Sequence, residues 1–236
     1  MQRDVAAHTH EVLAAIAAVR DPEIDEAVGT LGFELDAEVD ASGHVTVSMR
    51  LPTFWCPANF AFLIGEDMRR TVLALPWVSG FRLRLLDHFA GEEIGHGVSA
   101  GQGFDAAFPA HAGCDIGRLR QDFDQKAFLT RQGDLAAALR KRGWSDAALA
   151  ALTAEEAGGL AETEVVALVE AYVEKREALG LDGSGRVLAA ADGSPVAPED
   201  VSAHLRTIRA SAISARANGE MCRMLAAARH EIRTPG

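Results

Sequence analysis

Apolar and polar residues alternate with clear periods along the first ninety residues of the chain. These periods predict five elements in the order helix, strand, strand, helix, strand, over residues 5–19, 31–39, 45–51, 58–75 and 78–85. The first helix ends at Asp21-Pro22, because proline disfavours helical geometry in the residue before it. The turn at residues 40–43 joins the first two strands into a hairpin. We therefore predict a compact α+β domain over residues 1–90.

The mixed pattern of helices and strands ends near residue 90. Five glycines between Gly91 and Gly103 predict a flexible boundary or a functional loop, which we assign to residues 91–110. Residues 111–236 then form a predicted helical module. Long apolar-periodic stretches in it predict helices over residues 116–142, 145–157, 161–179 and 198–233, with a turn-rich insertion at 183–195.

Composition and charge argue against several classes of function. The chain has 48% hydrophobic and 24% charged residues, which is typical of a globular protein. Its formal net charge of −11 argues against a general nucleic-acid binder. Residues 201–236 nevertheless hold six Arg against two Glu, so we expect this tail to dock on an acidic surface of its own chain or of a partner. The sequence contains neither an apolar signal core nor a stretch of about 20 apolar residues, so we expect a cytoplasmic protein without a membrane span.

Cys56 is the most informative single residue. It directly precedes Pro57, which is favoured in the first turn of a helix. A thiol at a helix N-terminus is stabilised as thiolate, the form that binds soft metals and iron–sulfur units. The alternative is a buried structural cysteine. Neither Cys114 nor Cys222 forms a CxxC pair, and the apolar surroundings of Cys222 predict a place in the core.

Carboxylates and histidines gather in two other places. Asp21 and Glu23 flank a rigid proline and are candidate metal ligands, or simply solvated charges at a helix end. His88, Glu93 and His96 form the densest ligand-capable cluster, and Glu93 and His96 have the i, i+3 spacing that di-iron proteins use on helices. The neighbouring glycines favour a polar mobile loop there, with a metal-handling role as the alternative.

The pattern as a whole resembles the metal–sulfur cluster biosynthesis family. The resemblance covers about residues 8–90 and is carried by residues 19–24 (VRDPEI), Leu31-Gly32, the hairpin and Cys56-Pro57. Members of this family are accessory proteins of SUF-type assembly, of phenylacetate degradation and of cytosolic iron–sulfur targeting. The resemblance implies that Cys56 is the functional thiol and that Asp21 and Glu23 are the two carboxylates of the family's Asp-Pro-Glu motif. Where family members have a Thr/Ser-rich run before the cysteine, only Thr53 is present here.

Three functional hypotheses follow. In the first, which we favour, the protein is a non-enzymatic maturation factor that carries iron or an iron–sulfur cluster transiently on Cys56 and docks a client apoprotein through the helical module. The client could be a bacterial di-iron monooxygenase, and a homodimer sharing the cluster would supply the missing ligands. In the second, the protein is a metal-free adaptor between assembly partners. In the third, Cys56 is an enzymatic nucleophile, although no base is recognisable beside it.

Overall fold

The computed structural model describes residues 2–109, 115–160, 163–182 and 185–233. The chain divides into two compact units. The first unit comprises Met1–Ile116 and Ala217–Gly236, and the second comprises Gly117–Arg216. The expected fold class, a small α+β part together with a mainly helical part, is confirmed.

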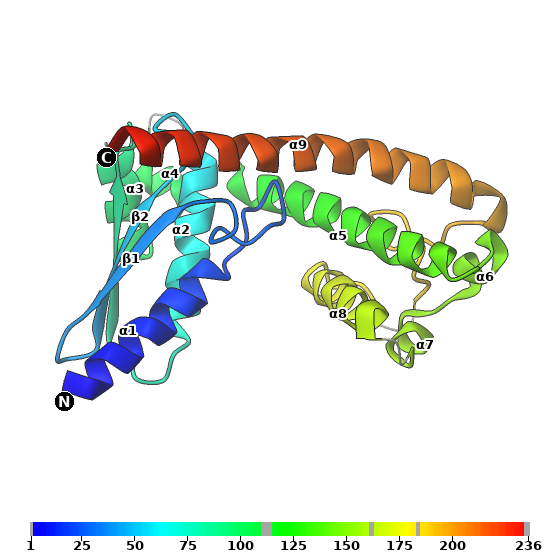
Figure 1. Ribbon diagram of the computed structural model, residues 1–236, viewed down its shortest axis with the longest axis horizontal. Helices are drawn as coiled ribbons and strands as arrows, with labels where there is room; N and C mark the ends of the chain where they lie inside the picture. Colours follow the sequence, from blue (N-terminus) through cyan, green and yellow to red (C-terminus); the bar gives the residue numbers. More distant parts are fainter. Residues whose placement is uncertain (1, 110–114, 161–162, 183–184, 234–236) are drawn as a thin grey trace. The chain divides into compact units, whose positions relative to one another are not determined.

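The first unit has the predicted order of elements, followed by two further helices (Figure 1). Its sheet has the order β1-β2-β3, with β1 antiparallel and β3 parallel to β2, and α2 forms the crossover between β2 and β3. The bounds are α1 (Gln2–Ala17), β1 (Glu34–Val39), β2 (His44–Arg50), α2 (Ala58–Leu73), β3 (Gly80–Leu86), α3 (Gly91–Ala100) and α4 (Phe104–Ala107).

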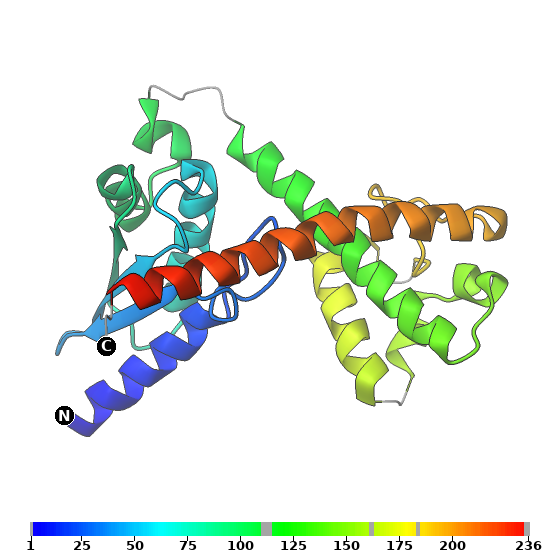
Figure 2. The same ribbon diagram turned by 45° about the horizontal axis from the view of Figure 1, so that its top comes forward.

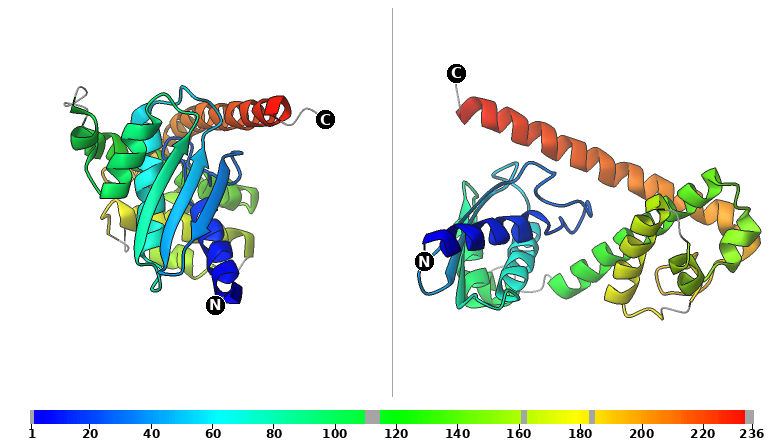
Figure 3. Two further views of the ribbon diagram at one scale, coloured as in Figure 1. Left: turned by 90° about the vertical axis from the view of Figure 1, so that its left-hand side faces the viewer. Right: turned by 60° about the horizontal axis from the view of Figure 1, so that its bottom comes forward.

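Alternation along the strands decides which face of the sheet is buried. Val45, Val47 and Met49 of β2 are fully buried, as the predicted period of two requires. α1 and α2 lie on this side of the sheet (Figures 1 and 3). The opposite face carries polar side chains such as Glu38 and Arg84, whose charged groups lie 3.5 Å apart.

The stretch that we expected to be a flexible loop is instead the helix α3, and the glycines explain why. A Cβ on Gly91 would lie 2.6 Å from the carbonyl oxygen of Leu85, and one on Gly95 would lie 3.0 Å from that of Leu83. These glycines thus let the helix approach the backbone of β3. Ser99 completes the contact, because its hydroxyl accepts the backbone N–H of Leu83 at 2.9 Å. α3 therefore covers the outer edge of β3, which would otherwise expose unpaired backbone groups.

The second unit is helical, with one irregular segment. The predicted helix over residues 145–157 is split, because Thr153 forms a capping box with Glu156 that starts a new helix. The first two residues of the predicted helix 161–179 lie outside the described residues. The bounds are α5 (Ile116–Lys141), α6 (Asp146–Ala151), α7 (Ala154–Gly158), α8 (Thr163–Ala178), the 3₁₀ turn η2 (Pro198–Asp200) and α9 (Val201–Arg233), of which only the part up to Arg216 belongs to this unit.

The core of the second unit combines apolar packing with buried polar groups. α5 and α8 lie side by side (Figures 1 and 2) and are joined by an ion pair of 2.8 Å between Asp124 and Lys175. Arg176 is only 2% exposed, and its guanidinium donates to the Tyr172 hydroxyl and to backbone carbonyls. The turn-rich segment buries Leu188 completely in this core. No helix in the described part of the chain is both long and apolar enough to span a bilayer.

Candidate functional site

Cys56 lies where the sequence predicts it, directly before the N-terminus of α2. Pro57 is the N-cap of this helix, and its carbonyl accepts the N–H groups of Phe60 and Ala61. The Cys56 side chain is half-buried against the core of the first unit. Its sulfur lies 3.0 Å from the Oγ1 of Thr53, a buried residue, so the two share a hydrogen bond. The thiol is therefore held by a defined partner yet keeps part of its surface accessible.

His88 fixes the backbone of the Cys56 loop from the other side. The N–H of Ala90 donates to the Nδ1 of His88 at 3.1 Å, so Nδ1 carries no proton. The protonated Nε2 then donates to the carbonyl oxygen of Cys56 at 2.8 Å. Burial lowers the pKa of His88, which favours this neutral tautomer. Both ring nitrogens are engaged, so His88 positions the Cys56 loop in this structure.

Exposed aromatic side chains surround this loop. Phe54, Trp55 and Phe89 are 56%, 59% and 66% exposed, respectively. Phe54 and Trp55 pack edge to face, with 4.7 Å between ring centroids, and Phe89 stacks on His88. Large exposed apolar side chains that gather in one place are typical of an interaction surface. The thiol thus lies within a hydrophobic part of the surface of the first unit.

Asp21 stabilises the loop that carries the two predicted carboxylates, its own and that of Glu23. Its Oδ1 accepts the backbone N–H groups of Glu23 at 2.9 Å and Ile24 at 3.0 Å. Its own N–H donates to the carbonyl of Glu26 at 2.9 Å. The Asp21 carboxyl is buried, and this burial raises its pKa. In this arrangement Asp21 holds the loop, and Glu23 stands half-buried beside it.

The C-terminal part of α9 packs on both loops, as the arginine-rich tail predicts. Arg223 forms an ion pair of 2.7 Å with Glu26. Arg229 donates to the carbonyl of Leu51 at 2.9 Å and to the carboxylate of Asp87 at 3.2 Å. The acidic surface that receives the tail therefore belongs, for these two arginines, to the same chain.

Cys222 lies on this contacting part of α9, so its predicted place in the core is wrong. The thiol is half-buried, and the pKa of Cys222 is raised to about 11, first by burial and then by the nearby groups of Asp21, Cys56 and Glu23. These groups act on the thiol because the helix turns this side towards the two loops. Fold, rather than sequence proximity, brings a second cysteine to the Cys56 site.

Glu93 and His96 lie on α3, away from the contacts described above. Both side chains are exposed. His96 lines a shallow hollow of about 460 Å³ between α3 and β3, together with Arg82 and Arg84. The two residues therefore have their i, i+3 spacing on a helix, where the sequence favours a polar loop. Two arginines beside His96 make this hollow an unfavourable place for a cation.

The donor groups do not form a complete metal centre. Among the described residues, no group of three or more His, Cys, Asp or Glu is arranged to hold a metal ion. Cys114 lies outside the described residues. Any metal held by Cys56 would therefore need ligands beyond those that the described part of this chain brings together.

Comparison with known proteins gives a match over the segment that carries these residues. A family model described as iron–sulfur cluster assembly protein matches residues 9–80, the segment that contains Asp21, Glu23 and Cys56. The chain is also similar to the "Fe-S protein maturation auxiliary factor" of Porphyromonas gingivalis (strain ATCC BAA-308 / W83), with 37% identity over 75 residues, which cover 32% of this chain and 70% of that protein. No solved structure matches. Through its first unit, the chain belongs to the iron–sulfur cluster assembly protein family.

Proposed function

We propose that this protein is an accessory factor in iron–sulfur maturation that carries iron or an iron–sulfur unit transiently on Cys56 and passes it to a client apoprotein. Membership of the family and the maturation role in the relative's name support the general role. The observation that carries the finer proposal is the partly accessible Cys56 thiol, hydrogen-bonded to Thr53 and fixed through its backbone by His88.

The geometry suits transient carriage better than permanent storage. A cluster with four protein ligands is held tightly, whereas the two cysteines at this site, Cys56 and Cys222, leave positions for ligands from elsewhere. A second copy of this chain or the client itself would supply them, and Glu23, whose charge acts on the Cys222 thiol, is a candidate carboxylate ligand from this chain. The exposed rings of Phe54, Trp55 and Phe89 offer an apolar contact around the thiol, which supports transfer in direct contact with the client.

The second unit is the part that would define the client in this proposal. The family match ends at residue 80 and does not extend over residues 117–216. We propose that this helical part, with the adjoining residues of the predicted module 111–236, docks the client, and that a di-iron monooxygenase is one candidate. A cytoplasmic place of action accords with this role.

A metal-free adaptor is the second candidate function. The finding in its favour is that no complete group of metal ligands occurs among the described residues. In this case the aromatic surface and α9 would bridge assembly partners, and Cys56 would be dispensable for binding them.

Anaerobic reconstitution separates the two functions. Wild type and Cys56→Ala are incubated with ferrous iron and sulfide, desalted, and analysed for iron and acid-labile sulfide per chain, with Cys114→Ala as the control cysteine variant. Carriage predicts iron in wild type and in Cys114→Ala but not in Cys56→Ala, and light scattering of the loaded protein tests the shared-cluster dimer. Absence of bound iron from all three folded proteins would refute carriage and leave the adaptor.

A further inference from the structure

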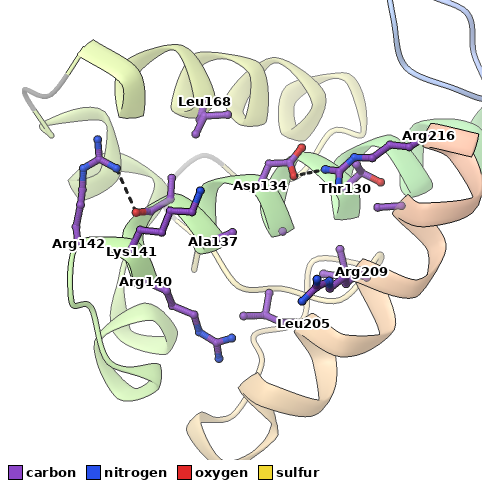
Figure 4. A pocket seen from close by; sticks show the side chains of 14 residues that line it. Thr130, Asp134, Ala137, Arg140, Lys141, Arg142, Leu168, Leu205, Arg209 and Arg216 are labelled. Carbon is purple, nitrogen blue, oxygen red and sulfur yellow. Dashed lines mark hydrogen bonds and ion pairs between the residues drawn. The ribbon is translucent and has the colours of Figure 1, made fainter. Parts of the chain in front are cut away.

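The second unit contains a groove whose charge is opposite to that of the whole chain. It is an open groove of about 900 Å³ lined by α5, α8 and α9 (Figure 4). Among the described residues that line it, Asp134 is the only carboxylate. The cationic residues that line it are Arg140, Lys141, Arg142, Arg209 and Arg216. A chain with a net charge of −11 thus concentrates positive charge in one place.

Part of this positive charge is not neutralised within the described chain. Arg216 pairs with Asp134 at 2.7 Å, and Arg140 pairs with Asp146 at 2.5 Å. Lys141 and Arg209, by contrast, have no hydrogen bond or ion pair with another described residue. Both are exposed at the groove, so their charges are available to a ligand.

The shape of the groove comes from two helix faces. The lining residues of α5 between Thr130 and Lys141 recur at intervals of three and four, and so do those of α9 between Leu205 and Arg216. Each face therefore extends for about three helical turns, roughly 16 Å. α5 and α9 approach closely at Gly133, where a Cβ would lie 2.6 Å from the side chain of Ile208.

The floor of the groove is apolar. Leu168 of α8 and Leu205 of α9, both partly exposed, contribute to it, while the cationic side chains stand around them (Figure 4). An apolar floor with a charged rim, between the faces of two helices, is an arrangement that receives an amphipathic helix.

We propose that this groove binds an acidic amphipathic helix of the client protein, with apolar side chains on Leu168 and Leu205 and carboxylates facing Lys141 and Arg209. This inference deepens the proposed function and rests on its client-docking part. A small anion alone would leave the apolar floor uncovered, and the exposed lining does not enclose a small ligand as substrate pockets do. An acidic amphipathic helix would cover the apolar floor and also pair with the cationic rim.

The test uses the full chain and a synthetic helical peptide of about 14 residues, which is long enough to span the groove. Leucines occupy one face of the peptide and glutamates the rest, and binding is followed by fluorescence anisotropy. Arg209→Glu is compared with Arg206→Glu, a matched control on the same helix that is exposed but does not line the groove. We expect Arg209→Glu to weaken binding by about tenfold or more and Arg206→Glu by less than about twofold.

A second pair of variants separates occupation of the groove from general electrostatic attraction. Ala137→Trp, on the exposed lining of α5, is expected to block the peptide, whereas Ala203→Trp, outside the groove, is expected to leave binding intact. A peptide with lysines in place of glutamates should bind at least about tenfold more weakly.

Equal effects of Arg209→Glu and Arg206→Glu would overturn the proposal, as would undiminished binding to Ala137→Trp. Displacement of the peptide by millimolar inorganic phosphate alone would also overturn it, in favour of a small-anion site. Iron content measured on the same samples keeps the two proposals apart. Loss of carriage would appear in Cys56→Ala with peptide binding retained, and loss of docking in Arg209→Glu with iron retained.

Discussion

Asp21 offers a direct way to tell a structural carboxylate from a metal ligand. Its Oδ1 accepts two backbone N–H groups, one of them buried, at 2.9 and 3.0 Å. Asp21→Ala removes this acceptor and leaves both N–H groups without a partner. At about 1 to 1.5 kcal/mol for each hydrogen bond lost, the loss in unfolding free energy is about 2–3 kcal/mol.

Asp21→Asn separates the two roles. The amide oxygen of asparagine can still accept a hydrogen bond from both N–H groups. The variant also lacks the carboxylate charge, which burial disfavours and whose pKa burial therefore raises. We therefore expect Asp21→Asn to lie within about 1 kcal/mol of wild type. If Asp21 acts only by closing the loop, the asparagine variant also retains iron after reconstitution.

Thermal unfolding of the three proteins at pH 7 measures the effect. At about 3 °C per kcal/mol for a protein of this size, Asp21→Ala should unfold about 6–9 °C below wild type, and Asp21→Asn within about 3 °C of it. An alanine variant as stable as wild type would refute the assigned role. An asparagine variant that is stable but loses its iron would show that Asp21 is a ligand.

Three further predictions concern the surroundings of the site. Burial lowers the pKa of His88 below its ordinary value of 6.5, so the contribution of His88 to stability is complete above pH 6.5 and is lost as pH falls through the lowered pKa. The difference in unfolding free energy between wild type and His88→Gln, measured by denaturant titration, should therefore shrink from pH 7.5 to pH 5. A difference that stays constant over this range would contradict the prediction. Gly91→Ala places a methyl group against a β3 carbonyl and should lower the unfolding free energy by about 2–3 kcal/mol. Gly103→Ala, with open space around it, should change the unfolding free energy by less than about 0.5 kcal/mol. Equal effects of the two variants in urea titrations would refute the packing argument for α3. Because the pKa of Cys222 is about 11, its alkylation rate followed by mass spectrometry should rise about tenfold per pH unit from pH 7 to pH 10. A rate that levels off near pH 9, the ordinary pKa of a thiol, would show that the thiol is not desolvated.

Local patterns in the sequence predict much of the fold because they report which face of an element is buried. The alternation in residues 31–51 is sufficient to predict the hairpin, and Pro57 marks the start of α2 beside Cys56. The capping pair Thr153 and Glu156 is also readable, and it begins a new helix, α7, within the stretch predicted as one helix.

Predictions fail where the decisive contact is distant in the sequence. Glycines lower the intrinsic tendency of α3 to form, and only their contact with the β3 backbone makes Gly91 and Gly95 favourable there. The place of Cys222 depends on Arg223 and Arg229, which hold α9 against loops nearly two hundred residues earlier. Their spacing on one helix predicts a shared face but not the surface that it meets.

Transfer of a cluster through Cys56 is the most direct test of the account. Wild type reconstituted with iron and sulfide is mixed anaerobically with an apo-ferredoxin, and cluster arrival is followed by circular dichroism, with Cys56→Ala treated identically as the comparison. We predict transfer from wild type and none above the rate with free iron and sulfide from Cys56→Ala. Transfer that is equally fast from both proteins would contradict the central role assigned to this thiol.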